Sequence, residues 1–143
     1  MAEREKVVLA YSGGLDTSVA IRWINENYDM DVIALTIDMG AQKDLEIARE
    51  RALKTGAIKC FIVDAREMFV KYFIWPALQA GAMYEGVYPL ATALGRPLIV
   101  KLLIDIARQE DAQAVAPGCT GKGNAQVRFD VGLRTLAPDL RII

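Results

Sequence analysis

The sequence predicts an α/β fold built on a doubly wound, mainly parallel sheet with helices on both faces. Three observations point to this fold. Apolar runs of strand length alternate with longer runs of helical periodicity, starting at residue 6. The apolar runs contain few polar residues, as in parallel strands that are covered on both faces. A glycine-rich turn joins the first strand run to the first helical run, which places a helix N-terminus beside a strand end.

The first half of the chain is expected to contain three strands and two helices. The strand runs, each nearly continuous in apolar residues, are Lys6–Tyr11, Asp31–Asp38 and Lys59–Asp64. The helical runs lie between them, at Asp16–Asn27 and at residues 45–56. The second helical run ends at Gly56, because glycine readily takes the left-handed conformation that closes a helix. This alternation predicts that the three strands pair in parallel.

The second half of the chain is less regular. Met68–Met83 is expected to be helical, with Pro76 starting or kinking a helix, and Phe69–Trp75 is expected to lie in the core. Pro97–Glu110 has an apolar face and a proline in its first turn, which predicts a helix beginning there. A strand, a helix and a last strand are expected at Ala112–Ala116, Asn124–Leu136 and Leu140–Ile143. The whole predicts a Rossmann-like sheet with a strand order of about 3-2-1-4-5.

Composition limits the classes of function. The 143 residues are the length of one domain. The net charge is −1 and there is no polybasic block, so we do not expect nucleic acid as a partner. No apolar stretch reaches the roughly 18 residues that cross a membrane, and the charged N-terminus lacks a signal-peptide core. Cys60 and Cys119 have neither paired nor metal-binding spacing, so we expect a cytoplasmic protein.

The absence of histidine narrows the chemistry further. Catalysis by a serine–histidine or cysteine–histidine pair is excluded, as are histidine general bases and histidine metal ligands. We expect no metal site made of protein ligands. Any reaction must therefore use carboxylates, hydroxyls, lysine, arginine and the dipoles of the backbone.

The loop Ser12–Ser18, called the first loop below, is the main candidate for an anion site. Gly13 and Gly14 let backbone N–H groups approach an anion closely, and three hydroxyl side chains add donors. Asp16 would repel a phosphate unless it caps the helix or holds a divalent cation against the phosphate. The loop matches neither the P-loop nor the dinucleotide pattern. A plain glycine turn with an Asp or Thr N-cap is the alternative interpretation.

A second glycine-rich loop, Gly118–Asn124, directly follows the fourth predicted strand. Open α/β sheets bind ligands beyond the carboxyl ends of the strands, where the strand order reverses, so the two loops are expected to face each other across one crevice. Lys122 would bring positive charge to phosphates, and Thr120 and Asn124 could orient ligand groups. A mobile surface loop with an incidental lysine is the alternative. Asp38 ends the second strand, where it could meet an adenosine or cap the next helix.

The segment Tyr84–Pro97 mixes aromatic residues, glycine and proline ahead of a helix. It could bring Tyr88, Thr92 and Arg96 to a site. Core tyrosines and a solvated arginine are the alternative interpretation of this segment, and a solvated helix arginine is the corresponding alternative for Arg128.

Together these sequence runs resemble the argininosuccinate synthase family. The matching runs, in order along the whole chain, are AYSGGLDTS (10–18), FIWPA (73–77), YPLATALGRP (88–97), GCTGKGN (118–124), QVRF (126–129) and APDL (137–140). The first run is shared by a wider group of ATP pyrophosphatases, and the later runs are specific to this family. The resemblance implies that citrulline is joined to aspartate in arginine biosynthesis, with ATP cleaved to AMP and pyrophosphate.

The resemblance also implies roles for single residues. ATP, accompanied by Mg²⁺, would be bound by Ala10, Tyr11, Ser12, Gly13, Gly14, Leu15, Asp16, Thr17, Ser18, Ile37 and Gly118. The substrates citrulline and aspartate would be bound by Tyr88, Thr92, Thr120, Asn124 and Arg128. Asp16 and Lys122 would take part in catalysis. A homo-oligomer is implied for the full-length family member.

The chain departs from the family pattern near the site. Pro117 stands where the family usually has His, and Ala125 stands where it usually has an Asp that helps to bind aspartate. Family members are also far longer than 143 residues. We therefore expect residues 1–143 to be an ATP-binding domain without the C-terminal synthetase and oligomerisation region, weak or inactive alone. The alternatives are another adenylating ATP pyrophosphatase and a degenerate, non-catalytic nucleotide-binding module.

Overall fold

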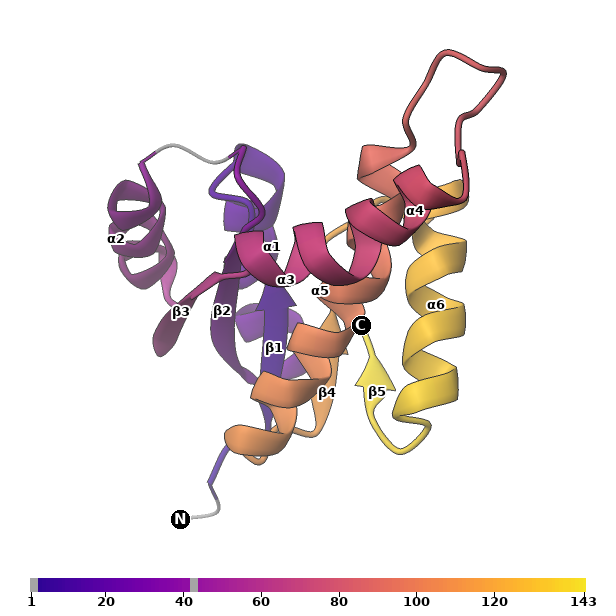
Figure 1. Cartoon of the computed structure of the whole chain (residues 1–143). Helices are drawn as coiled ribbons and strands as arrows, with labels where there is room; N and C mark the ends of the chain where they lie inside the picture. The colour runs from indigo at the N-terminus through magenta and orange to yellow at the C-terminus, as the bar shows by residue number, and fades with distance from the viewer. Residues whose placement is uncertain (1–2, 42–43) are drawn as a thin grey trace.

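The computed structural model of the chain describes residues 3–41 and 44–143. The described part forms a five-stranded sheet in the order β3-β2-β1-β4-β5, with every neighbouring pair parallel (Figure 1). The strands are β1 (Lys6–Ala10), β2 (Asp31–Asp38), β3 (Lys59–Asp64), β4 (Ala114–Ala116) and β5 (Arg141–Ile142). The predicted fold class and strand order are confirmed.

The strand order reverses at β1, and this reversal positions the site. Val8 of β1 pairs with Ile33 of β2 on one side and with Val115 of β4 on the other. The chain after β1 turns toward β2 and β3, whereas the chain after β4 turns toward β5. The carboxyl ends of β1 and β4 are therefore neighbours from which the two glycine-rich loops leave, as expected for a ligand-binding crevice.

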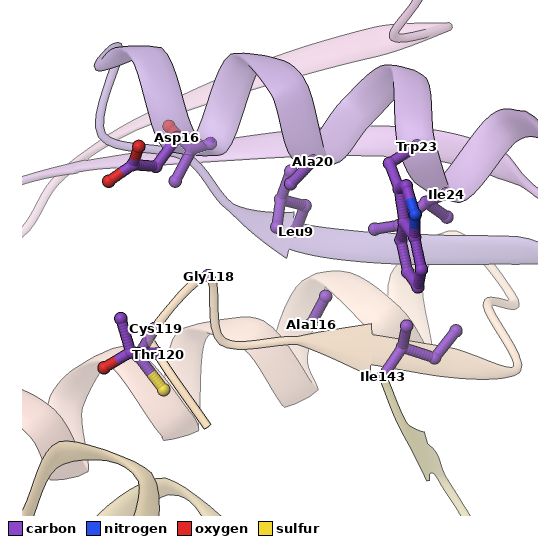
Figure 2. A pocket seen from close by; sticks show the side chains of 11 residues that line it. Leu9, Asp16, Ala20, Trp23, Ile24, Ala116, Gly118, Cys119, Thr120 and Ile143 are labelled. Carbon is purple, nitrogen blue, oxygen red and sulfur yellow. The ribbon is translucent and has the colours of Figure 1, made fainter. Parts of the chain in front are cut away.

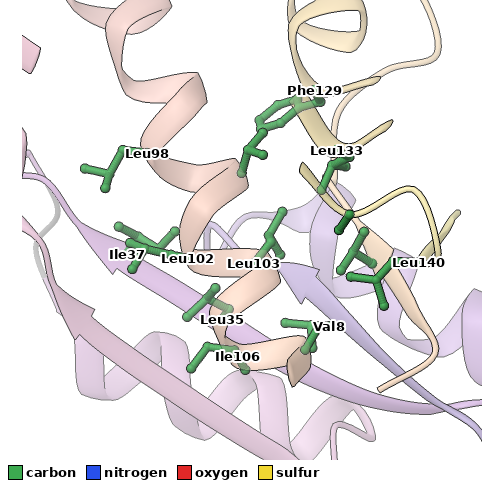
Figure 3. Packing of buried hydrophobic residues seen from close by; sticks show 14 of the residues in the cluster. Val8, Leu35, Ile37, Leu98, Leu102, Leu103, Ile106, Phe129, Leu133 and Leu140 are labelled. Carbon is green, nitrogen blue, oxygen red and sulfur yellow. The ribbon is translucent and has the colours of Figure 1, made fainter. Parts of the chain in front are cut away.

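Helices cover both faces of the sheet (Figure 1). The main helices are α1 (Leu15–Tyr28), α2 (Leu45–Thr55), α5 (Ala91–Gln109) and α6 (Asn124–Leu136). Side chains of β1 alternate between two cores, since Val7 and Leu9 pack with α1 and α2 whereas Val8 packs with α5 and α6. The second of these cores is the larger, and Figure 3 shows Leu103 and Phe129 among its buried side chains.

Helix α5 begins earlier than the sequence predicts. Its first residue is Ala91, so Pro97 lies inside the helix and not in its first turn. Pro97 has no N–H and cannot donate to the carbonyl of Ala93. Gly95 and Leu98 are both buried on the side that faces the sheet, so tertiary packing extends the helix across the proline.

The predicted helix at Met68–Met83 is a continuous helical run that includes a widened turn. It consists of α3 (Arg66–Phe69), the π-helical turn η1 (Val70–Ile74) and α4 (Trp75–Gln79). The N–H of Trp75 donates to the carbonyl of Val70, five residues back. Trp75 separates the widened turn from Pro76, which has no N–H and lies in the first turn of α4.

The expected burial of Phe69–Trp75 is wrong for part of the run. Phe69 is 7% exposed, but Val70, Tyr72 and Trp75 are 53%, 62% and 58% exposed. Six of these seven residues are apolar and extend around the whole circumference of a helix, whereas only one side of this helix packs against the core. The exposed side chains are therefore a consequence of helical periodicity.

Other differences from prediction concern the ends of elements. β1 ends at Ala10 and not at Tyr11, and β4 begins at Ala114 and not at Ala112. β5 is limited to Arg141–Ile142. Within residues 3–41 and 44–143, no helix combines the length and the apolar content that crossing a membrane requires.

Candidate functional site

The first loop is held in place by its own hydroxyl groups. The Ser12 and Thr17 hydroxyl oxygens lie 3.2 Å apart, and the Ser18 hydroxyl donates to the Gly14 carbonyl at 2.8 Å. The Tyr11 hydroxyl oxygen lies 2.9 Å from that of Ser18. Thr17 and Ser18 are buried, so these bonds fix the loop from the inside of the fold.

The start of α1 leaves backbone donors available. Its N-cap residue is Gly14, and within the described residues no side chain caps the helix. The interpretation of Asp16 or Thr17 as the N-cap is therefore wrong. The first N–H groups of a helix have no intrahelical acceptor and form a ready site for an anion. Asp16 is exposed in this first turn, where its carboxylate could hold a cation beside the anion.

The second loop contacts the first at Gly118. Gly118 has a φ of +66°, and a Cβ there would lie 2.6 Å from the carbonyl oxygen of Ala10 and 3.2 Å from Cγ2 of Thr17. A backbone atom cannot move aside as the end of a side chain can, so only glycine fits. This contact brings the two donor-rich loops to one point.

A pocket of about 160 Å³ opens beside this point on the α5 side of the sheet. We call it the strand-end pocket, and its walls include Ala10, Ser12, Ile37, Met39, Arg96 and Gly118. Its inner wall is apolar and its rim carries the first loop. The Arg96 guanidinium carbon lies 5.5 Å from the centre of the Phe129 ring, which is 1% exposed. This cation–π contact fixes a positive charge in the wall.

A larger pocket of about 520 Å³ lies at the N-terminal turns of α5 and α6. We call it the helix-start pocket, and its walls include Tyr88, Thr92, Arg96, Asn124, Ala125 and Arg128. The Tyr88 hydroxyl oxygen lies 3.1 Å from that of Thr92. Arg96 lines both pockets and therefore stands at their common boundary.

A third pocket, of about 260 Å³, lies on the other face of the sheet between α1 and β4 (Figure 2). Asp16 and Thr120 lie at one end of it, and Trp23 and Ile143 lie at the other. Thr17 and Gly118 separate this α1 pocket from the strand-end pocket, since they line both. The residues described as lining it are mainly apolar and none is Lys or Arg, so their side chains offer a phosphate no positive charge.

The structure gathers most of the residues singled out from the sequence. Those lining the strand-end pocket are Ala10, Tyr11, Ser12, Thr17, Ile37 and Gly118. Tyr88, Thr92, Asn124 and Arg128 line the helix-start pocket, and Thr120 lines the α1 pocket. Asp16 also lines the α1 pocket. Leu15 is 79% exposed. The predicted site residues outside these three pockets are Gly13, Gly14, Leu15, Ser18 and Lys122.

The sequence suggests that Arg96, with Tyr88 and Thr92, could reach a site but assigns it no specific role, whereas in the structure it lines both pockets. A signal was available, because Thr92 and Arg96 are four residues apart and so share one face of a helix. That signal depends on a helix beginning at Ala91, whereas Pro97 suggested a later start. Within residues 3–41 and 44–143, Arg96 forms no ion pair.

The Cys119 thiol and the Asp64 carboxyl, both near strand ends, have shifted pKa values. Burial raises the pKa of the Cys119 thiol, an effect opposed by the positive charge of Arg96, so this thiol stays protonated at neutral pH. Asp38 accepts a hydrogen bond from the Gly40 N–H at 2.8 Å and lies 3.6 Å from Nε of Arg66. Arg66 also lowers the pKa of Asp64 to about 2 through a side-chain hydrogen bond.

Comparison with known proteins gives one family. The chain matches the family described as arginosuccinate synthase N-terminal HUP domain over residues 6–143. It is 63% identical over 139 residues to the argininosuccinate synthase of Dehalococcoides mccartyi, and 56% identical over 140 residues to that of Oceanobacillus iheyensis. These matches cover 97% and 98% of this chain and 34% of each relative. The chain thus spans about a third of the length of the curated relatives it matches.

Solved structures share the fold at low sequence identity. The chain is similar to the predicted subunit of tRNA methyltransferase from Methanocaldococcus jannaschii, with a TM-score of 0.65 and 17% identity. The match covers 97% of this chain and 67% of that chain. At this identity the likeness concerns the fold alone.

Proposed function

The chain belongs to the argininosuccinate synthase family, and from this premise we propose that it binds ATP at the meeting point of its two loops. One observation carries the proposal: Gly118 approaches Ala10 and Thr17 so closely that both glycine-rich loops surround one point. The apolar strand-end pocket beside this point, which ends at Ile37, has room for part of the nucleoside. The relatives named as argininosuccinate synthases support this reading.

The proposed position of the phosphates follows from the positions of the donors. The first loop and the start of α1 offer backbone N–H groups to the β- and γ-phosphates, and Lys122 of the second loop adds positive charge there. Arg96 stands at the boundary of the two pockets and faces the α-phosphate. Both cationic side chains would stabilise the charge that develops during cleavage between the α- and β-phosphates.

The family also implies Mg²⁺ with ATP. Across the described ranges, no three His, Cys, Asp or Glu side chains gather closely enough to hold a metal ion by themselves. Mg²⁺ is commonly held by one carboxylate together with substrate phosphates. Asp16, exposed in the first turn of α1, fits this requirement. When bound, the ion would neutralise charge on the departing pyrophosphate.

We propose that the helix-start pocket takes the acceptor, citrulline, through Tyr88, Thr92, Asn124 and Arg128. Thr120 and Asn124 would contact the second substrate, aspartate. Arg96 links this pocket to the phosphates, so an acceptor oxygen here would face the α-phosphorus. The chain contributes positioning and charge stabilisation, and the reaction requires no covalent intermediate on the protein.

The bond changes of the proposed reaction are as follows. The ureido oxygen of citrulline attacks the α-phosphorus, an O–P bond forms, and the bond to the bridging oxygen breaks with its electron pair leaving on pyrophosphate. The amine of aspartate then attacks the ureido carbon. The C–O bond breaks, AMP leaves with the electron pair, and the former ammonium of aspartate gives up two protons in total to yield a guanidinium group.

Ala125 favours a second candidate, in which the chain binds the nucleotide without completing the synthesis. This residue lines the helix-start pocket with a methyl group, which cannot pair with the ammonium of aspartate. The first half-reaction does not need that contact.

The two free cysteines, Cys60 and Cys119, are compatible with a reducing cytoplasm, where we place this activity. A homo-oligomer for the full-length protein remains part of the proposal.

The test compares three ligands on the wild-type chain by isothermal titration calorimetry with Mg²⁺. We expect ATP, AMP and pyrophosphate all to bind. Arg96→Met should weaken ATP and AMP by about 10- to 150-fold, because it removes a charged hydrogen bond to the α-phosphate, and should leave pyrophosphate unchanged. Arg22→Met, on the exposed side of α1, is the matched control. No binding of ATP or pyrophosphate by the wild type would refute the proposed function.

A further inference from the structure

Helix α2 lies directly behind the first loop. A Cβ added to Gly13 would lie 3.0 Å from the Cβ of Ala48 on α2. Arg51 is three residues further along the same helix and so shares the face of Ala48. Its Nη1 donates a hydrogen bond of 2.5 Å to the carbonyl of Gly13. The loop is thus held by a cationic side chain from a different element, 38 positions away in the sequence.

The carbonyl groups around the loop are drawn away from the anion site. The Thr36 hydroxyl donates to the Tyr11 carbonyl at 3.0 Å. The Gly14 carbonyl accepts from the Ser18 N–H at 3.2 Å and from the Ser18 hydroxyl at 2.8 Å. Arg51 provides the corresponding bond for Gly13. A carbonyl oxygen that faced a phosphate would repel it, so these bonds favour an inward direction for the N–H groups.

The Gly13–Gly14 peptide is the part of the loop most free to turn over. In a trans peptide the C=O of one residue and the N–H of the next point in opposite directions. With the Gly13 carbonyl held on α2, the Gly14 N–H points to the other side, where it lies 3.3 Å from the Ser12 hydroxyl oxygen. Ser12 lines the strand-end pocket. A reversal of this peptide changes ψ of Gly13 and φ of Gly14, and glycine accepts either sign of φ at little cost, so no Cβ opposes the reversal.

We propose that Arg51 is a positioning residue that locks the Gly13–Gly14 peptide with its N–H toward the pyrophosphate end of ATP. The inference rests on the proposed function of the loop. It adds that a side chain of α2 fixes the orientation of the loop peptide before the ligand binds. With the lock, the anion meets a preorganised donor. Without it, binding must also order the peptide, which weakens the affinity for any ligand that uses the loop.

Charge alone is the competing explanation, and α2 offers a matched control. Arg49 lies two residues earlier on the same helix, is exposed, and lines a separate pocket against β3. Its substitution removes the same charge from the same helix without touching Gly13. A through-space effect would also fade at high salt, since the screening length is about 3 Å at 1 M. The loss of a lock would persist there.

The test measures binding of pyrophosphate, ATP and AMP by calorimetry to the wild type and to Arg51→Met, Arg51→Lys and Arg49→Met, at low and high salt. Arg51→Met should weaken pyrophosphate and ATP about tenfold or more at both salt concentrations and leave AMP unchanged. Arg51→Lys retains a donor and should lie between Arg51→Met and the wild type. Arg49→Met should bind as the wild type does. Thermal unfolding of each variant reports whether the fold is intact.

The outcomes separate the lock from the function on which it rests. Wild-type binding of all ligands combined with unchanged Arg51→Met would overturn the lock and leave nucleotide binding standing. An equal loss in Arg49→Met, or an equal loss of AMP, would overturn it as well, because either result would indicate charge or general distortion. A wild type that binds neither ATP nor pyrophosphate would remove both proposals.

Discussion

The two halves of the site differ in how firmly their polar groups are held. In the proposed nucleotide half, formed by the first loop and the strand-end pocket, Thr17 and Ser18 are buried and hydrogen-bonded to the loop. In the acceptor half, formed by the helix-start pocket, Tyr88, Asn124 and Arg128 are exposed. The polar contact there joins Tyr88 to Thr92 at 3.1 Å. The nucleotide half is therefore preorganised, whereas the acceptor half must order its side chains when it binds.

The origin of the difference lies in the elements that supply each half. The first loop directly follows a buried strand, and the pairing of that strand with both neighbours fixes where the loop backbone begins. The acceptor residues stand on the first turns of two helices and on the segment before α5, where long side chains extend into solvent. Each side chain that becomes fixed on binding costs about 0.5–1.5 kcal/mol. We infer that this chain binds the nucleotide more readily than the acceptor.

The largest expected effect comes from breaking the nucleotide half at Gly118. Gly118→Ala would place a methyl group 2.6 Å from the Ala10 carbonyl oxygen at a φ of +66°. Overpacking and the unfavourable φ together should lower the free energy of unfolding by about 2 kcal/mol or more, and should abolish ATP binding. Denaturant unfolding and calorimetry measure these effects.

Gly121 provides the control within the same loop. A Cβ there meets nothing within 4 Å, so Gly121→Ala should leave stability and ATP affinity unchanged. If Gly118→Ala behaved like Gly121→Ala, the close contact between the loops would have no role in binding.

The next effect concerns the acceptor half, at Ala125. Ala125→Asp introduces a carboxylate into the helix-start pocket, at the start of α6, where a negative charge is favoured. A hydrogen bond between this carboxylate and the ammonium of aspartate should raise the affinity for aspartate by about 10- to 150-fold. NMR titration in the presence of ATP measures this change.

Succinate serves as the control ligand, because it has the two carboxylates of aspartate and no ammonium. Ala125→Asp should not raise its affinity. An equal gain for succinate and aspartate, or no gain for aspartate, would show that position 125 does not contact the amine.

The smallest expected effect is on the pH dependence of thermal stability, and it comes from charged residues at the ends of β2 and β3. Arg66 holds the pKa of Asp64 at about 2, below the ordinary value of 3.8. A depressed pKa stabilises the folded state above the ordinary value, and this contribution is lost as the pH falls toward 2. The wild type should therefore lose slightly more thermal stability between pH 4 and pH 2 than Asp64→Asn does. Identical pH profiles in calorimetric melts would contradict this.

Much of the fold could be predicted because apolar strand runs alternate with helical runs, a pattern typical of a parallel sheet. Val8 and its neighbours in β1 are buried on both faces, and this pattern indicated a parallel sheet before any contact was known. The helix start at Pro97 was wrong because burial of Gly95 and Leu98 outweighed the local preference of proline. The two loops could be recognised because glycine and hydroxyl residues, which are typical of anion sites, directly follow the strand runs in the sequence.

The parts of the site that depend on distant contacts could not be predicted. Arg51 meets Gly13 across 38 residues, and nothing in its own segment distinguishes it from Arg49. Arg96 could be proposed as a site residue from the sequence, but its place between the two pockets depends on where α5 begins. The tight approach of Gly118 to Ala10 follows from the neighbouring positions of β1 and β4, which only the assembled sheet defines. The roles of these residues in binding remain predictions for the experiments above.

The most direct test of preorganisation is a pair of calorimetric titrations of the wild-type chain, one with ATP and Mg²⁺ and one with citrulline alone. We predict that ATP binds at least about tenfold more tightly than citrulline, and that citrulline binds more tightly once ATP is present. Citrulline binding without nucleotide at an affinity equal to that of ATP would contradict this prediction.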